Sequence, residues 1–249
     1  MATSARPTRA TVTERLDRVD DPELDESIVE LDYIHDLAID ESSVTVELVL
    51  PTAWCSPAFA WMMATGARDE IEDLSGVEEC TVRLEDHMHE DEINRGVNEG
   101  LAFEDAFPDA EDGIADVRRT LDEKARMGRQ YRAVEALTDA GIDPEQVVEL
   151  RRADVSLDDE QALVSLADGG LVVPVPAEPM AEYLRKATAV GLVTDSTDRL
   201  FATPDGETIP TAEFEPVQRR ARLAKTNATG QGSVCSALNE ARNGVQGAD

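Results

Sequence analysis

The hydrophobic pattern of the first third of the chain predicts a small domain in which helices and strands are mixed. Apolar residues at helical spacing, with Thr11 or Thr13 as the cap, predict a short helix that ends near Arg18. Strand and helix patterns follow in the order strand, strand, helix, strand, at residues 33–39, 44–50, 58–74 and 77–84. The resulting order over residues 11–86 is typical of a compact α+β domain.

The remaining residues predict a linker and then a mainly helical region. Residues 87–113 are polar and acidic with interspersed glycines, so we expect a linker there. A stripe of apolar residues predicts a long helix over residues 114–140. Shorter elements are expected after it: helices at 143–152 and 179–190, small hairpins at 153–175 and 200–209, and a helix beyond about 213. We therefore assign residues 114–249 to a mainly helical C-terminal region that carries small hairpins.

The charge balance adds a prediction about the surface. The 249 residues include 53 Asp and Glu against 23 Lys and Arg, for a net charge of −30, and only three of the basic residues are lysine. This balance suits a halophilic protein, because molar salt shortens the Debye length to about 3 Å and screens self-repulsion. Few aromatic residues would also fit disorder, but the clear strand and helix patterns favour a folded chain. The acidity disfavours a nucleic-acid partner, which requires a basic surface.

Cysteine content and the apolar runs favour a cytoplasmic location. Cys55, Cys80 and Cys235 form no pairwise disulfide framework. No apolar run approaches the roughly 20 residues of a membrane span, so we expect no membrane partner. The first ten residues lack the apolar core of a signal peptide. No phosphate-binding loop, CxxC or HExxH motif occurs, which disfavours a nucleotide-dependent or hydrolytic enzyme.

The strongest chemical candidate is Cys55, in a turn punctuated by Pro51 and Pro57 between a predicted strand and a predicted helix. Unpaired N–H groups and the positive end of the helix dipole occur at such a position, and both lower the pKa of a thiol. Together with the Asp21-Pro22-Glu23 turn, the thiolate could hold a transition metal or the edge of an iron–sulfur cluster. The alternative is a loop cysteine without a role.

Two further sets of residues could carry chemistry. His87 and His89 alternate in an extended segment and could join a metal site, although such short runs are usually solvated. Cys235 follows a polar segment and could be an exposed thiol that meets Cys55, or simply a thiol without a role. Cys80 lies in a predicted strand and is expected to be a buried small hydrophobe.

Basic residues concentrate in residues 118–132 and 219–225. Pairing within the chain, with the acidic N-terminal domain, is the favoured explanation. The alternative is a docking surface for an acidic partner protein.

Residues 11–86 resemble the PaaD/SufT-like metal–sulfur cluster assembly domain. The resemblance rests on the Asp21-Pro22-Glu23 turn, on the loop Thr52-Ala-Trp-Cys55-Ser-Pro57, and on the order of elements around them. Most members have Pro directly after Cys, whereas Ser56 intervenes here. The resemblance implies that Cys55 is the functional thiol, with Asp21, Glu23 and Thr52 lining its pocket.

By the same resemblance, the protein is expected to be a maturation factor without turnover of its own. Its partners would be client metalloenzymes or cluster-assembly proteins, and its cargo a transient iron–sulfur cluster or iron. The C-terminal part is similar to a long form of the family associated with oxygenase systems. An accessory interaction subunit of a multicomponent oxygenase is therefore one alternative. Another is a thiol-dependent enzyme with Cys55 as nucleophile and His35 as base. A homodimer stays open.

Overall fold

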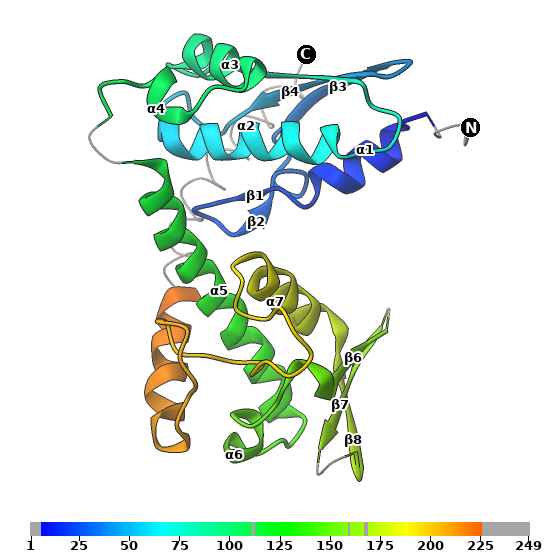
Figure 1. Ribbon diagram of the computed structural model, residues 1–249, viewed down its shortest axis with the longest axis vertical. Helices are drawn as coiled ribbons and strands as arrows, with labels where there is room; N and C mark the ends of the chain where they lie inside the picture. The colour runs from blue at the N-terminus through cyan, green and yellow to red at the C-terminus, as the bar shows by residue number, and fades with distance from the viewer. Residues whose placement is uncertain (1–5, 111–112, 159, 167–168, 226–249) are drawn as a thin grey trace, which may run out of the picture. The chain divides into compact units, whose positions relative to one another are not determined.

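The computed structural model describes residues 6–110, 113–158, 160–166 and 169–225, and Figure 1 shows the order of their elements. The chain divides into two compact units with a boundary between Arg119 and Thr120. Helices and strands occur in both units, which confirms the α+β fold class.

Unit 1 is built on a three-stranded sheet in the order β3-β4-β5. Its elements are α1 (Arg9–Leu16), β1 (Asp20–Asp21), β2 (Glu26–Ser27), β3 (Ile34–Asp40), β4 (Ser43–Val49), α2 (Pro57–Glu72), β5 (Glu79–Glu85), α3 (Glu90–Glu99) and α4 (Phe103–Ala106). β3 and β4 form an antiparallel hairpin, whereas β4 and β5 are parallel and are connected through α2. Helix α2 packs against β5, α1 and α3 (Figure 1).

The alternating pattern of β4 creates the centre of this core. Val44, Val46 and Leu48 are almost fully buried, because successive side chains of a strand point to opposite faces. Thr8 caps α1 by accepting a hydrogen bond from the Thr11 N–H at 3.2 Å, and the Thr11 hydroxyl accepts from the Thr8 N–H at 3.0 Å. The cap therefore lies three residues before the expected Thr11, whose own side chain completes the capping box.

The expected linker at residues 87–113 includes two helices, α3 and α4, that pack into unit 1. Ile93, Val97 and Phe103 are buried in the same core as the sheet residues. The Phe103 ring meets Trp61 of α2 edge to face, with ring centroids 5.6 Å apart. The polar sequence of this segment belongs to the exposed side of an amphipathic helix, so polarity alone gave the wrong expectation.

Two asparagines of α3 occupy the outer edge of β5. Asn94 accepts from the Leu84 N–H at 2.7 Å and donates to the Leu84 carbonyl at 2.9 Å. Asn98, one turn later, makes the same pair of bonds with Val82, at 2.9 and 2.7 Å. The two asparagines are four residues apart on the helix, and the two strand residues are two apart on β5. The side-chain amides therefore make the hydrogen bonds to β5 that a neighbouring strand would otherwise make.

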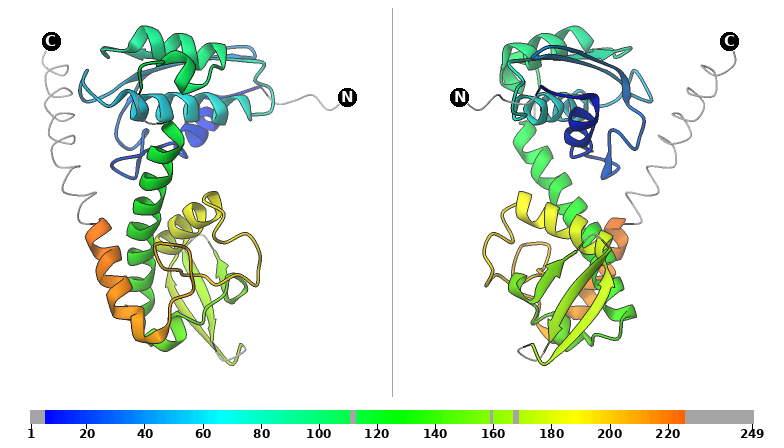
Figure 2. Two further views of the ribbon diagram at one scale, coloured as in Figure 1. Left: turned by 60° about the vertical axis from the view of Figure 1, so that its left-hand side comes forward. Right: turned by 90° about the vertical axis from the view of Figure 1, so that its right-hand side faces the viewer.

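Unit 2 has a second three-stranded sheet, with the antiparallel order β6-β7-β8. Its elements are α5 (Ile114–Asp139, which begins before the unit boundary), α6 (Pro144–Val147), η1 (Arg152–Asp154), β6 (Val155–Leu157), β7 (Gln161–Leu166), β8 (Leu171–Pro176), α7 (Ala177–Ala189) and η2 (Thr211–Glu213). Residues 214–225 are helical and run beside α5 (Figures 1 and 2). Helix α7 packs on β6 and β7.

Several expected elements of unit 2 are shorter than their patterns suggested. The helix expected at 143–152 is limited to α6. Of the hairpin expected at 200–209, the described residues form one isolated bridge, between Ala202 and Thr208.

Two of the basic residues of α5, Arg126 and Arg132, have partners within unit 2. Arg126 is buried and donates to the carbonyls of Thr203 and Pro204 at 2.8 and 3.0 Å. Arg132 pairs with Glu182 at 2.9 Å, and Lys186 of α7 pairs with Asp122 of α5 at 2.7 Å. These partners belong to unit 2 itself, and not to the N-terminal domain with which pairing was expected.

Candidate functional site

The Cys55 loop connects the end of β4 with the first turn of α2. Thr52 orders it from within: its hydroxyl accepts from the Trp54 N–H at 3.2 Å, and its carbonyl accepts from the Cys55 N–H at 3.4 Å. Ser56 is the N-cap residue of α2 without a side-chain cap bond, and Pro57 occupies the first turn. Cys55 is half-buried, just ahead of the helix N-terminus.

A second segment, residues 87–89, forms hydrogen bonds to the backbone of this loop. The imidazole Nε2 of His87 lies 3.0 Å from the Cys55 carbonyl oxygen, and its Nδ1 accepts from the His89 N–H at 3.2 Å. Because Nδ1 is an acceptor, Nε2 carries the proton and donates it to the Cys55 carbonyl. The Met88 N–H donates to the Ala53 carbonyl at 3.1 Å. We call this set of bonds the His87 clamp.

The electrostatics of His87 favour the neutral ring that the clamp requires. The side chain is buried, and burial lowers the pKa of His87 below its ordinary value, which outweighs the opposing hydrogen bond to Cys55. Both ring nitrogens bond to the backbone, so His87 orients the thiol loop. The hypothesis of His87 as a metal ligand does not fit this use of its nitrogens.

Asp21 organises its own turn. One carboxylate oxygen accepts from the N–H groups of Glu23 and Leu24 at 2.8 and 3.1 Å, and the other accepts from the Tyr33 hydroxyl at 3.3 Å. Burial raises the pKa of Asp21 more than these hydrogen bonds lower it. Glu23 is half-buried in the same turn.

The remaining predicted site residues lie in different surroundings. Burial raises the pKa of Cys80 to about 12, so this thiol stays protonated, as expected for a buried small hydrophobe. His89 stacks edge to face on Phe107, with centroids 5.6 Å apart, and lies 3.9 Å from Glu92. Cys235 lies outside the described residues.

The described residues contain no group of three or more His, Cys, Asp or Glu side chains placed to hold a metal ion. The hypothesis that Cys55, Asp21 and Glu23 together form a ligand set therefore has no support from their arrangement. Iron–sulfur clusters are generally held by four Cys ligands. Within the described part of the chain, Cys55 is the single thiol suited to contribute one of them.

Sequence reasoning missed two residues beside the thiol. Trp54 is 76% exposed and Met88 is 53% exposed, although large apolar side chains usually avoid water. They lie on the two segments that the bond between Met88 and Ala53 joins. Trp54 could have been singled out as a large aromatic residue in a turn, but Met88 carried no signal.

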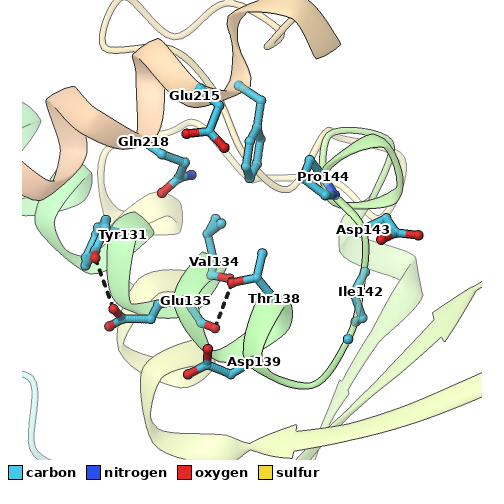
Figure 3. A pocket seen from close by; sticks show the side chains of 12 residues that line it. Tyr131, Val134, Glu135, Thr138, Asp139, Ile142, Asp143, Pro144, Glu215 and Gln218 are labelled. Carbon is cyan, nitrogen blue, oxygen red and sulfur yellow. Dashed lines mark hydrogen bonds between the residues drawn. The ribbon is translucent and has the colours of Figure 1, made fainter.

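Unit 2 has a pocket of about 480 Å³ between the end of α5, the loop after it and helix 214–225 (Figure 3). Its lining combines apolar side chains with four carboxylates: Val134, Ile142, Pro144 and Phe214 with Glu135, Asp139, Asp143 and Glu215. No cysteine or histidine lines it, so it offers nothing for metal–sulfur chemistry.

The fold and the loop of unit 1 define a small α+β domain that presents one half-buried thiol on a fastened strand-to-helix turn. Residues 9–84 match the family model described as iron-sulfur cluster assembly protein. The uncharacterized protein MJ1129 of Methanocaldococcus jannaschii is 32% identical over 93 residues, which are 37% of this chain and 96% of that protein. The chain belongs, through its N-terminal domain, to the iron–sulfur cluster assembly protein family.

Two further observations concern possible membrane spans and the extent of the family match. Within the described residues, no helix is both long and apolar enough to cross a membrane. The family match ends at residue 84, so residues 114–225 receive no assignment from it.

Proposed function

We propose that the protein takes part in assembling or maturing iron–sulfur centres of client enzymes, and that Cys55 is the thiol that handles the cargo. The observation that carries the proposal is the placement of Cys55. It lies within the family-matched region, just ahead of the N-terminus of α2, on a loop fixed by the His87 clamp. A fixed loop lowers the entropy that must be lost when a thiolate meets a cluster.

We further propose that the cargo is held jointly with a partner. The described residues offer one suitable thiol, and a cluster needs several ligands. The missing ligands would come from a client, from an assembly protein or from a second copy. Shared ligation suits a carrier, because a site that is incomplete alone releases its cargo readily.

Anaerobic reconstitution with iron and sulfide tests the proposal. We expect the wild-type chain to gain visible cluster absorbance and the Cys55→Ser variant to lose most of it. Cys80→Ser is the matched control, because that thiol is buried and protonated. Absorbance that survives in Cys55→Ser and disappears in Cys80→Ser would overturn the assignment of the thiol.

Alkylation separates this proposal from the enzyme alternative. A nucleophilic cysteine with a general base would react with iodoacetamide at a rate that depends on His35. His35 lies exposed on β3, and the ring nitrogens of His87 both bond to backbone groups. We therefore expect His35→Ala to leave the alkylation rate unchanged, and a large decrease would favour the enzyme.

A further inference from the structure

We propose that Trp54 and Met88 form a docking surface beside Cys55 for a client protein that presents an apolar side chain flanked by Lys or Arg. This inference rests on the proposed function for its assumption that a protein partner approaches the thiol. The chemistry of the partner comes from the apolar and charged residues around the loop.

The two side chains are exposed on a surface that is already ordered. The bond between the Met88 N–H and the Ala53 carbonyl places their segments next to each other, and the bond between His87 Nε2 and the Cys55 carbonyl joins the same segments a second time. An interface gains affinity when its aromatic and Met side chains need little ordering on binding. Exposed Trp and Met beside a functional thiol therefore fit an apolar anchor of another protein.

The charges around the surface select the partner. Residues 85–92 carry five carboxylates, at Glu85, Asp86, Glu90, Asp91 and Glu92. No Lys or Arg occurs in residues 84–94 or in residues 48–67, which include the thiol loop. Two exposed apolar side chains beside a segment rich in carboxylates favour a partner that carries basic side chains, because complementary potentials steer encounter and like charges oppose it.

The same argument disfavours a second copy of the chain on this surface. Two identical copies would bring the acidic segments 85–92 of both chains together, in a protein of net charge −30. A basic client avoids that repulsion and can supply the cluster ligands that the described residues lack. We therefore commit to a client rather than a homodimer at this face.

A titration with designed peptides tests the surface in the metal-free, full-length chain. The probe is a synthetic amphipathic helix with Leu on one face and Lys around it. The readouts are the NMR signals of the Met88 methyl group and the Trp54 indole N–H. We expect saturable shifts of both signals, with no shift of the Met180 methyl group, which is fully buried in unit 2.

Two control peptides resolve the two parts of the proposal. A peptide with Glu in place of Lys tests the charge, and one with Ser in place of Leu tests the apolar contact. Both are expected to bind at least tenfold more weakly. Equal binding of the Glu peptide would overturn the basic partner, and equal binding of the Ser peptide would overturn the apolar anchor.

Matched variants locate the binding site. Met88→Gln and Asp91→Lys are each expected to weaken binding of the Leu/Lys peptide about tenfold. Their controls in unit 2, Leu171→Gln and Glu145→Lys, also change exposed residues and should leave affinity unchanged. Equal losses in the controls would show nonspecific attraction to an acidic protein and would overturn the site.

Failure of the docking surface can be distinguished from failure of the proposed function of Cys55. Peptide binding requires no cluster, so Cys55→Ser should bind as tightly as the wild type. If Cys55→Ser took up a cluster as well as the wild type while both proteins bound the peptide, the function of the thiol would be rejected and the docking surface would stand. Cluster uptake by the wild type that depends on Cys55, without peptide binding, would reject the docking surface and leave the function of the thiol.

Discussion

The ring of His87 acts as a bridge between two backbone segments, and protonation would break that bridge. A proton on Nδ1 would face the His89 N–H, which now donates to that nitrogen at 3.2 Å. The folded state therefore prefers neutral His87, and its pKa is lower than in the unfolded chain. Between the two pKa values the unfolded state binds more protons, so stability must fall as the pH decreases.

We expect the His87 contribution to be complete above about pH 6.5 and to be lost as the pH falls from there through the lowered pKa. Urea unfolding at a series of pH values, compared between wild type and His87→Gln, measures it. The difference between the two proteins should shrink toward acid pH. A difference that grows toward acid pH would contradict the clamp.

The Asp21 carboxylate gives a second prediction for a single residue. Asp21→Ala leaves the N–H groups of Glu23 and Leu24 without their acceptor, at a cost of about 1–3 kcal/mol in the free energy of unfolding. Asp21→Asn retains an acceptor oxygen and removes a charge that burial disfavours. We expect the Asn variant to lie much closer to wild type in chemical denaturation. Equal losses would show that the charge, rather than the turn, matters.

At the scale of elements, Gly96 allows α3 to pack closely on α2. A Cβ atom at this position would lie 2.5 and 2.6 Å from the nearest ring carbons of Trp61. Gly96→Ala should therefore destabilise unit 1 by roughly 1–3 kcal/mol, because overpacking forces the ring or the helix to shift. Thermal unfolding followed by Trp fluorescence measures this loss.

Gly128 of α5 is the matched control for that substitution. Its added Cβ would meet backbone atoms of Lys225 at 3.6 Å, which is an ordinary contact. Gly128→Ala should stabilise its helix by roughly 0.5–1 kcal/mol, since alanine loses less backbone entropy than glycine in a helix interior. Destabilisation of both variants to the same degree would contradict the Trp61 contact as the cause.

The elements of unit 1 were predictable where the hydrophobic period was regular. The alternation through Val44, Val46 and Leu48 predicted β4 nearly to its ends, and Pro57 marked the start of α2. Helix α3 was missed because its apolar residues, such as Ile93 and Val97, are sparse among acids. A short helix can pack into a core through a single stripe of a few apolar residues, so its overall sequence can stay polar.

The surroundings of the thiol were less predictable than its position. Sequence spacing placed Cys55 on a strand-to-helix turn, but it could not show which later residue would meet that turn. His87 lies 32 residues further on, in the segment between β5 and α3. Its role arises because the fold brings that segment next to the Cys55 loop. The use of Asp21 within its own turn was likewise decided by burial, which local pattern does not report.

For the whole molecule, the charge of −30 should make stability depend on salt. We expect the acidic surface to suit a saline solution, where screening over about 3 Å at 1 M salt weakens self-repulsion. The unfolding temperature should rise as KCl increases from about 0.1 to 1 M. KCl is preferable to sulfate, because sulfate strengthens apolar burial by itself. An unfolding temperature that does not change with KCl would contradict this expectation.

The asparagine pair on β5 has a consequence for assembly. A strand from another chain can extend a sheet only along an edge whose N–H and C=O groups are available, and Asn94 and Asn98 occupy those of Leu84 and Val82. Of the two edges of the β3-β4-β5 sheet, growth is therefore restricted to β3. A sheet that can grow from one side alone can pair two copies edge to edge, but it cannot propagate into a fibre.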